Sequence, residues 1–245
     1  MELPLALGPL LICCAVICTA SFVQGNVGFG MALLSTPILM IIDPSIGATP
    51  VILAAVPMSA GVTWRERKHC RADYVGWILL GSFPGSLAAA LTLTLLRQNL
   101  NLLAIVLGAL ILLAVGISLW GLHPAIGRRS LFMAGLAGGF TGTTTAVGGP
   151  PLAIVLQTLD GASFRGTINL AFLFTGLIAI GNLALTRQIR QMDFMLALPF
   201  AASCVTGIAL SNLTAGRIPA GTLRYLILGL AALAAIVLIV EHLVT

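Results

Sequence analysis

Charged side chains are scarce in this sequence. They make up 8% of its 245 residues, while hydrophobic residues make up 59%. A soluble domain carries about a quarter charged residues, so this chain could not cover itself with a polar surface in water. A bilayer core about 30 Å thick needs roughly 20 apolar residues per crossing helix. We therefore expect an all-α, polytopic integral membrane protein with about eight transmembrane segments joined by short loops.

Groups suited to catalysis or metal binding are missing from the hydrophobic runs. The three histidines, His69, His123 and His242, lie near segment ends, and no Asp or Glu lies inside a run. The five cysteines show no metal-ligand or redox spacing. Hydrolysis or group transfer would need a nucleophile with a base, paired carboxylates or a metal cluster. We expect no catalytic residue, no metal and no cofactor.

Basic residues form short clusters between the hydrophobic runs. The net charge of +5 therefore looks like a set of orientation signals rather than a nucleic-acid surface. If each run crosses once, the clusters at 65–71, 128–129 and 187–190 share one face, which the positive-inside rule makes cytoplasmic, and both termini lie there too. The runs fall at about 5–23 with an extension through 31–42, then 47–64, 74–96, 102–121, 131–159, 166–185, 194–213 and 222–240.

The sequence matches itself without gaps at an offset of 120 residues. Charged residues coincide in three pairs, which is improbable by chance because they are so rare. The pairs are Arg67 with Arg187, Asp73 with Asp193, and Arg97 with Arg217. Internal repeats of this size are typical of transporters. We expect two four-helix repeats, 1–124 and 125–245, forming one transmembrane domain. Four crossings would make the repeats parallel, whereas a partial crossing at an interrupted first segment would invert them.

The first segment of each half is interrupted by glycine and polar residues. The first half reads Gln24-Gly25-Asn26-Val27-Gly28-Phe29-Gly30, and the second reads Gly138-Gly139-Phe140-Thr141-Gly142-Thr143-Thr144-Thr145-Ala146-Val147-Gly148-Gly149-Pro150-Pro151. Glycine weakens a helix and proline cannot donate a backbone hydrogen bond, so a continuous helix is not expected. Non-helical backbone at membrane depth persists only where protein or a water-filled cavity satisfies it.

These interruptions are the candidate substrate site. A helix that restarts inside the membrane presents unpaired N–H groups and a partial positive charge, which suits an anion. The alternative is that the small residues only let helices approach closely. Prolines and polar side chains together favour the binding site. The candidate substrate-binding residues are Gln24, Asn26, Gly28, Gly30, Thr143, Thr144, Thr145, Gly148, Gly149 and Pro150.

At these residues the sequence resembles the sulfite exporter TauE/SafE family. The resemblance rests on Gly25-Asn26-Val27-Gly28-Phe29-Gly30 with Pro37 downstream, on Gly138 to Gly142, and on Val147-Gly148-Gly149-Pro150-Pro151-Leu152. It implies a multi-pass transporter of the bacterial inner membrane that moves sulfite, an organosulfonate or another small sulfur-containing or organic anion. Many relatives are expected to have a tighter glycine cluster where this chain has Phe29.

Two further functions compete with a carrier that works by alternating access. A passive anion channel or a membrane subunit of a larger complex would fit the lack of an intramembrane carboxylate, which proton-coupled transporters often use. The two-fold repeat with paired broken helices favours the carrier. The expected partners are a small anion and the lipid bilayer, with no nucleic acid. Coupling to a proton or another cation, self-association, substrate and direction stay open.

Overall fold

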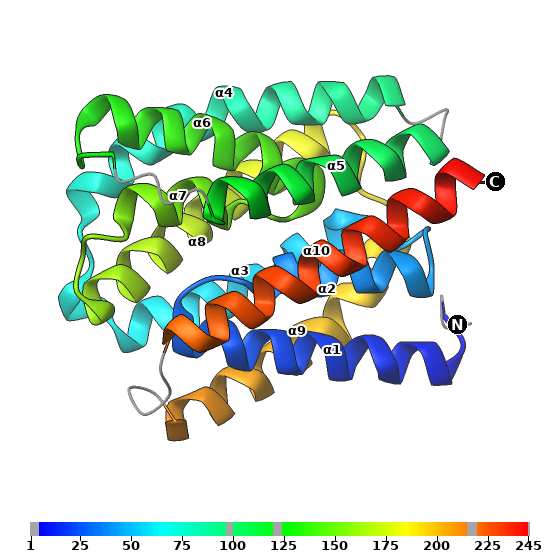
Figure 1. Ribbon diagram of the computed structural model, residues 1–245, viewed down its shortest axis with the longest axis horizontal. Helices are drawn as coiled ribbons and strands as arrows, with labels where there is room; N and C mark the ends of the chain where they lie inside the picture. The colour runs from blue at the N-terminus through cyan, green and yellow to red at the C-terminus, as the bar shows by residue number, and fades with distance from the viewer. Residues whose placement is uncertain (1–4, 97–99, 120–123, 215–219, 245) are drawn as a thin grey trace.

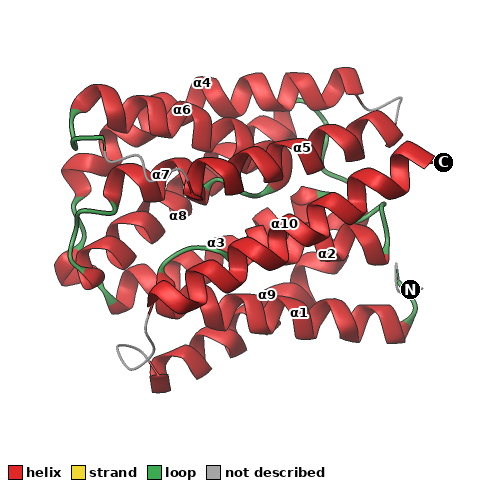
Figure 2. Cartoon of the chain, viewed as in Figure 1, coloured by secondary structure: helices red, strands yellow, loops and turns green. Residues whose placement is uncertain are grey.

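The chain is helical throughout the part described by the computed structural model, which covers residues 5–96, 100–119, 124–214 and 220–244. Short loops connect the helices (Figure 2). In chain order the helices are α1 (Leu7–Val27), α2 (Met31–Ile42), α3 (Ala48–Arg65), the short 3₁₀ helix η1 (Arg67–His69), α4 (Ala72–Leu96), α5 (Leu100–Leu119), α6 (Arg128–Thr145), α7 (Gly149–Leu156), α8 (Gly161–Leu185), α9 (Gln191–Thr214) and α10 (Ala220–Val244).

Both predicted interruptions end a helix. Between α1 and α2, Gly28 and Gly30 have φ angles of 105° and 120°, a conformation that glycine adopts without a steric penalty. We call Gly28–Gly30 the first break. Between α6 and α7, Ala146 has a φ of 62°, which is uncommon for a residue with a Cβ. We call 146–151, which includes the first three residues of α7, the second break. Each predicted first segment is thus two helices.

Helices on the two sides of the molecule run in opposite directions. In Figure 1, α1 runs from right to left and α6 from left to right, and α5 and α10 are opposed in the same way. The largest helix contacts recur when each α helix is exchanged for the one five places along the chain: α4 packs on α6 as α9 packs on α1, and α3 packs on α9 as α8 packs on α4. The pairs α3 with α8 and α5 with α10 map onto themselves.

Glycines let α4 and α6 approach until their backbones touch. A Cβ on Gly81 or Gly85 would collide with the carbonyl oxygen of Phe132 or Leu136, and a Cβ on Gly135 would collide with that of Ile78. These glycines are therefore packing residues, as small residues are at many interfaces between membrane helices. Gly108, on α5, packs closely against the Ile239 side chain of α10.

The outer surface carries large apolar side chains. Leu95 is 82% exposed, Leu185 80% and Leu198 77%. Extended apolar surface of this kind indicates contact with lipid rather than water. Within the described residues, four helices are long and apolar enough to cross a membrane, namely α1, α4, α8 and α9, and three shorter apolar stretches lie in α2, α5 and α10. These features fit a multi-pass membrane protein.

The basic loops do not share one face, which corrects the expectation from sequence. The loop at 65–73 and the start of α6 lie at the left in Figure 1, whereas the loop at 186–190 lies at the right, with the starts of α1 and α3. Contacts agree, since Arg190 donates to the carbonyl of Ser45 at 2.7 Å and Arg71 N–H to Thr167 Oγ1 at 3.1 Å. The reason is the extra reversal at each break. We call the left side the basic end.

Candidate functional site

A cavity lies where the two breaks meet. We call it the central cavity; its volume is about 70 Å³ for the centres of water-sized molecules, and roughly 10–15 Å³ on this scale holds one water. Residues of α2, α3, α6 and α8 and of both breaks line it, and none of the described lining residues is charged. The space therefore suits a few waters or one small solute held by neutral groups.

The cavity is lined by positions that are 120 residues apart. Four pairs lie on α3 and α8 and two lie at the breaks. The pairs are Ile52 with Phe172, Ala55 with Thr175, Val56 with Gly176, Ser59 with Ala179, Phe29 with Gly149, and Gly30 with Pro150. Phe29 of the first half contacts Gly149 of the second half directly, because a Cβ on Gly149 would lie 3.1 Å from the Phe29 ring.

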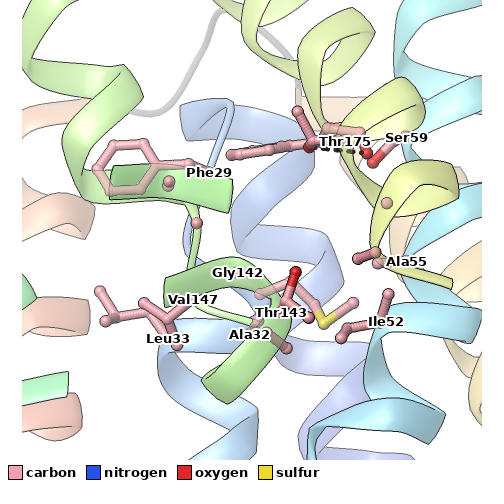
Figure 3. A pocket seen from close by; sticks show the side chains of 18 of the residues that line it. Phe29, Ala32, Leu33, Ile52, Ala55, Ser59, Gly142, Thr143, Val147 and Thr175 are labelled. Atoms are coloured by element: carbon pink, nitrogen blue, oxygen red, sulfur yellow. Dashed lines mark hydrogen bonds between the residues drawn. The ribbon is translucent and has the colours of Figure 1, made fainter. Parts of the chain in front are cut away.

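Two hydroxyl groups lie together at one side of the cavity (Figure 3). Ser59 is 1% exposed, and its Oγ has no hydrogen-bond partner within the described residues. Thr175 Oγ1 donates to the carbonyl of Phe172 over 3.4 Å, a long and weak bond. Leaving a buried hydroxyl unpaired costs about 1–3 kcal/mol. Ser59 and Thr175 are therefore the side chains best placed to bind a polar ligand.

The start of α2 supplies backbone donors. Gln24 Oε1 accepts the N–H of Met31 at 3.0 Å, so that first N–H is already paired. Ala32 and Leu33 follow it and line the cavity; as the second and third residues of the helix, they have no carbonyl one turn earlier in the helix to bind. Their N–H groups have no other backbone or side-chain partner in the described chain.

The start of α7 supplies space instead of donors. Its first three residues are Gly149, Pro150 and Pro151, and proline has no N–H. Only Gly149 can donate there. The expectation that both restarting helices present several N–H groups to a ligand is thus wrong for the second half, because the prolines that break the helix also remove its donors.

The predicted site residues divide into two groups. Those that line the central cavity are Gln24, Gly30, Thr143, Gly148, Gly149 and Pro150. Those outside its lining are Asn26, Gly28, Thr144 and Thr145.

Each residue outside the cavity has a structural partner. Asn26 Nδ2 donates to the carbonyl of Phe22, and the Gly28 carbonyl accepts from Asn169 Nδ2. Thr145 Oγ1 accepts the N–H of Val147, which holds the second break, and Thr144 Oγ1 donates to the carbonyl of Phe140. Gln24 also has a structural task, since its Nε2 donates to Asn169 Oδ1 at 3.2 Å.

A second pocket adjoins the cavity on the side away from the basic end. We call it the end pocket; its volume is about 160 Å³ on the same scale, and its lining includes Ser45, Thr144 and Arg190. Thr143 lines both spaces. Thr143 therefore stands between the central cavity and the end of the molecule that carries the loop at 186–190.

Comparison with known proteins assigns the family. Residues 13–238 match the sulfite exporter TauE/SafE family. The chain belongs to this family. The resemblance seen in the glycine motifs is confirmed over nearly the whole chain, and TauE/SafE proteins are membrane transporters, which agrees with the apolar helices. Comparison with curated proteins and with solved structures gives no match.

Sequence reasoning missed Ser59 and Thr175 in this TauE/SafE protein. Both lie in long apolar helices, and one hydroxyl in such a helix is commonly a packing residue. The 120-residue offset does identify α3 and α8 as equivalent helices of the two halves. It does not tell which face of either helix meets the breaks. That information comes only from the packing of α3 on α8.

Proposed function

We propose that this protein carries a small oxyanion across the membrane, with the central cavity as its binding site. The observation that carries the proposal is the buried Ser59 hydroxyl without a partner, placed in a neutral cavity beside the first turn of α2. The oxygens of an oxyanion would accept from Ser59 and Thr175 on one side of the cavity and from the Ala32 and Leu33 N–H groups on the other. The partial positive charge at a helix start favours an anion there.

Neutral donors suit transport because the ligand must leave as well as bind. A lone cation at membrane depth would be expensive to bury and hard to separate from an anion. Sulfite or an organosulfonate fits the family and the size of the space. Ile52, Ala55 and Val56 of α3 also line the cavity, and they would contact the less polar part of an organosulfonate.

The proposed mechanism is alternating access by two inverted repeats, 1–124 and 125–245. Each contains five helices once the breaks are counted, and an odd number inverts the second copy. The matched packing, the opposed helix directions and the paired cavity positions support this reading. In inverted-repeat transporters, substrate sites lie at the repeat interface, and the two arrangements of the repeats open the site to either side.

The orientation follows from charge. Among the described side chains, the basic end carries seven basic and three acidic residues, a net charge of +4, whereas the opposite end carries two of each and is neutral. The positive-inside rule therefore places the basic end in the cytoplasm. The start of α1 and the end of α10 lie at the other end (Figure 1), so both would face outward in this proposal. The sequence had led us to expect cytoplasmic termini.

Cysteine labelling tests the orientation. Burial, with help from the negative charge of Glu66, raises the pKa of the Cys70 thiol, so its reactive thiolate is scarce near neutral pH. Cys70 should react slowly with an impermeant maleimide, and only in inside-out vesicles. Lys68→Cys and Ser45→Cys, both exposed, give faster probes of the two ends. Rapid labelling of Lys68→Cys in cells with a permeable outer membrane only would reverse the orientation.

Flux into proteoliposomes tests the function. Purified protein should take up ³⁵S-sulfite or labelled sulfoacetate with saturable, gradient-dependent kinetics. Conductance without saturation would identify a channel instead. No flux of any tested anion, with activity restored only by other membrane proteins, would identify a subunit of a complex.

A further inference from the structure

Two guanidinium groups share one carboxylate at the basic end. Glu66 Oε1 accepts from Arg65 Nε at 3.2 Å and from Arg165 Nε at 3.1 Å. The side chains are only 21%, 11% and 19% exposed for Arg65, Glu66 and Arg165. One negative charge thus balances two positive charges in a partly buried place, which leaves an excess of one positive charge. We call Arg65 and Arg165 the arginine pair.

The two arginines differ in how many of their donors are used. Arg65 Nη2 donates to the carbonyl of Gly25 at 2.6 Å, and Arg65 Nη1 donates to Asn212 Oδ1 at 2.7 Å. Arg165 donates only through Nε, so its two Nη groups have no partner within the described residues. A guanidinium with two unused parallel donors fits the two oxygens of a carboxylate, sulfite or sulfonate.

The arginine pair lies directly behind the first break. The Gly28 backbone packs on Arg165, whose Cγ would be 3.2 Å from a Cβ on that glycine. Phe164, next to Arg165, meets Phe29 edge to face with ring centroids 6.3 Å apart. Phe29 itself lines the central cavity. The aromatic pair of Phe29 and Phe164 therefore separates the arginine pair from the cavity.

The same groups tie the two halves together. Arg65 and Glu66 follow α3 in the first half, and Arg165 belongs to α8 in the second. The equivalent positions at the other end are Leu185, Thr186 and Ser45, none of which is charged. The arrangement is therefore present at one end only, and any effect of it on transport should be one-sided.

We propose that the arginine pair is a second anion-binding site, which the Glu66 carboxylate occupies in this structure and which the transported oxyanion occupies when it displaces Glu66. The proposal rests on the transport function proposed above. Glu66 acts as a tethered substitute for the ligand, because its carboxylate partly neutralises the positive charge of the two arginines while no anion is bound. An incoming anion that takes its place removes the link between α3 and α8 at the basic end, next to Phe29 and Phe164.

Transport from each side tests the proposal. We would measure the KM for ³⁵S-sulfite in right-side-out and inside-out vesicles. Arg165→Gln should raise the KM about tenfold when sulfite is presented at the basic end and leave the KM at the opposite end unchanged. Glu66→Gln should lower the KM at the basic end at least threefold. The exposed pair of Arg71 and Asp73, which lies in the same loop, supplies the controls Arg71→Gln and Asp73→Asn, which should change neither value.

The proposal would be overturned if a folded variant changed the KM equally at both ends or left both KM values unchanged. Either result would show that Arg65, Glu66 and Arg165 form only a structural ion cluster. If Glu66→Gln does not fold, Glu66→Asp, whose shorter side chain bridges the arginines less well, should shift the KM in the same direction.

A wild-type protein without flux would contradict the proposed function but not this site. In that case, sulfite should still raise the Tm of detergent-solubilised Glu66→Gln more than that of Asp73→Asn. The gain should disappear in Glu66→Gln combined with Arg165→Gln. No difference in Tm between Glu66→Gln and Asp73→Asn would refute the second site.

Discussion

The two breaks occupy matching places in the chain but contribute different chemistry. The first break uses glycines in left-handed conformations, and Gln24 and Asn169 hold it by hydrogen bonds. Ala32 and Leu33, whose N–H groups have no partner in the described chain, line the cavity beside it. The second break uses Ala146 in a left-handed conformation and Thr145 as a brace, and its prolines remove donors. In the proposed site, the first break would therefore supply the donors and the second the space.

The contact between Phe29 and Gly149 shows the difference between the two breaks. A phenyl ring on one side fits against a glycine on the other, with no space for another side chain. The departure from a tighter glycine cluster that Phe29 represents is thus matched by its partner position. We therefore expect a larger side chain in the second break to reduce transport, whereas a larger side chain at a glycine with free space around it should not.

Gly149→Leu should have the largest effect. Its Cβ would meet the rings of Phe29 and Phe172, and the rest of the side chain would fill the cavity. Flux should fall to less than about a tenth of the wild-type value at equal expression. Gly181→Leu is the matched control, because nothing lies within 4 Å of a Cβ there. Normal flux in Gly149→Leu would remove the second break from the site.

Gly148 is a poorer test position than Gly149. A Cβ at Gly148 would lie 2.8 Å from the carbonyl oxygen of Gly138, which is backbone and cannot move aside cheaply. Gly148→Leu would therefore disturb the packing of α6 on α7 whether or not an anion binds nearby. Loss of flux in that variant has two causes that flux alone does not separate.

Ser59→Ala should have the next largest effect. A hydrogen bond to a charged group contributes about 1.5–3 kcal/mol, which corresponds to an increase of roughly 10- to 150-fold in Kd for the anion. The protein should fold normally, since the hydroxyl has no partner to lose. Ser82→Ala is the control: Ser82 Oγ is equally buried and unpaired but lies outside the cavity lining. Equal Kd values for the two variants would contradict the site.

Thr143→Val should have a smaller effect and Thr144→Val the smallest. Thr143 lines the cavity while its Oγ1 donates to Ser86 Oγ at 2.8 Å, so its hydroxyl is partly committed. Thr144 lines only the end pocket. We expect the Kd to rise a few-fold for Thr143→Val and by less than twofold for Thr144→Val, measured by thermal shift or flux. The reverse order would place the anion in the end pocket.

Much of the helical layout was predictable, because the apolar composition and the positions of the few charged residues mark where the helices begin and end. The hydrophobic runs, both interruptions and the 120-residue offset are visible without coordinates. The place of Gln24 at the cavity was also predicted, but its bonds to Met31 and Asn169 were not. The bridging role of Asn169, which bonds Gln24 and the Gly28 carbonyl, was not visible either.

The rest depends on contacts between distant segments. The side of the loop at 187–190 follows from the reversal at each break, which an apolar pattern does not reveal because α2 is as hydrophobic as its neighbours. The grouping of Arg65, Glu66 and Arg165 joins positions 99 residues apart. Ser59 looks like an ordinary packing residue until α3 is seen to face the cavity.

The most direct test of the central claim is the position of selenite, a heavier analogue of sulfite, in a structure of the protein determined by anomalous diffraction. The account predicts a selenium peak in the central cavity, within hydrogen-bond reach of Ser59 Oγ and the Ala32 N–H, and its loss in Ser59→Ala. A peak confined to the arginine pair or to the loop at 186–190, with the cavity occupied by water alone, would contradict it.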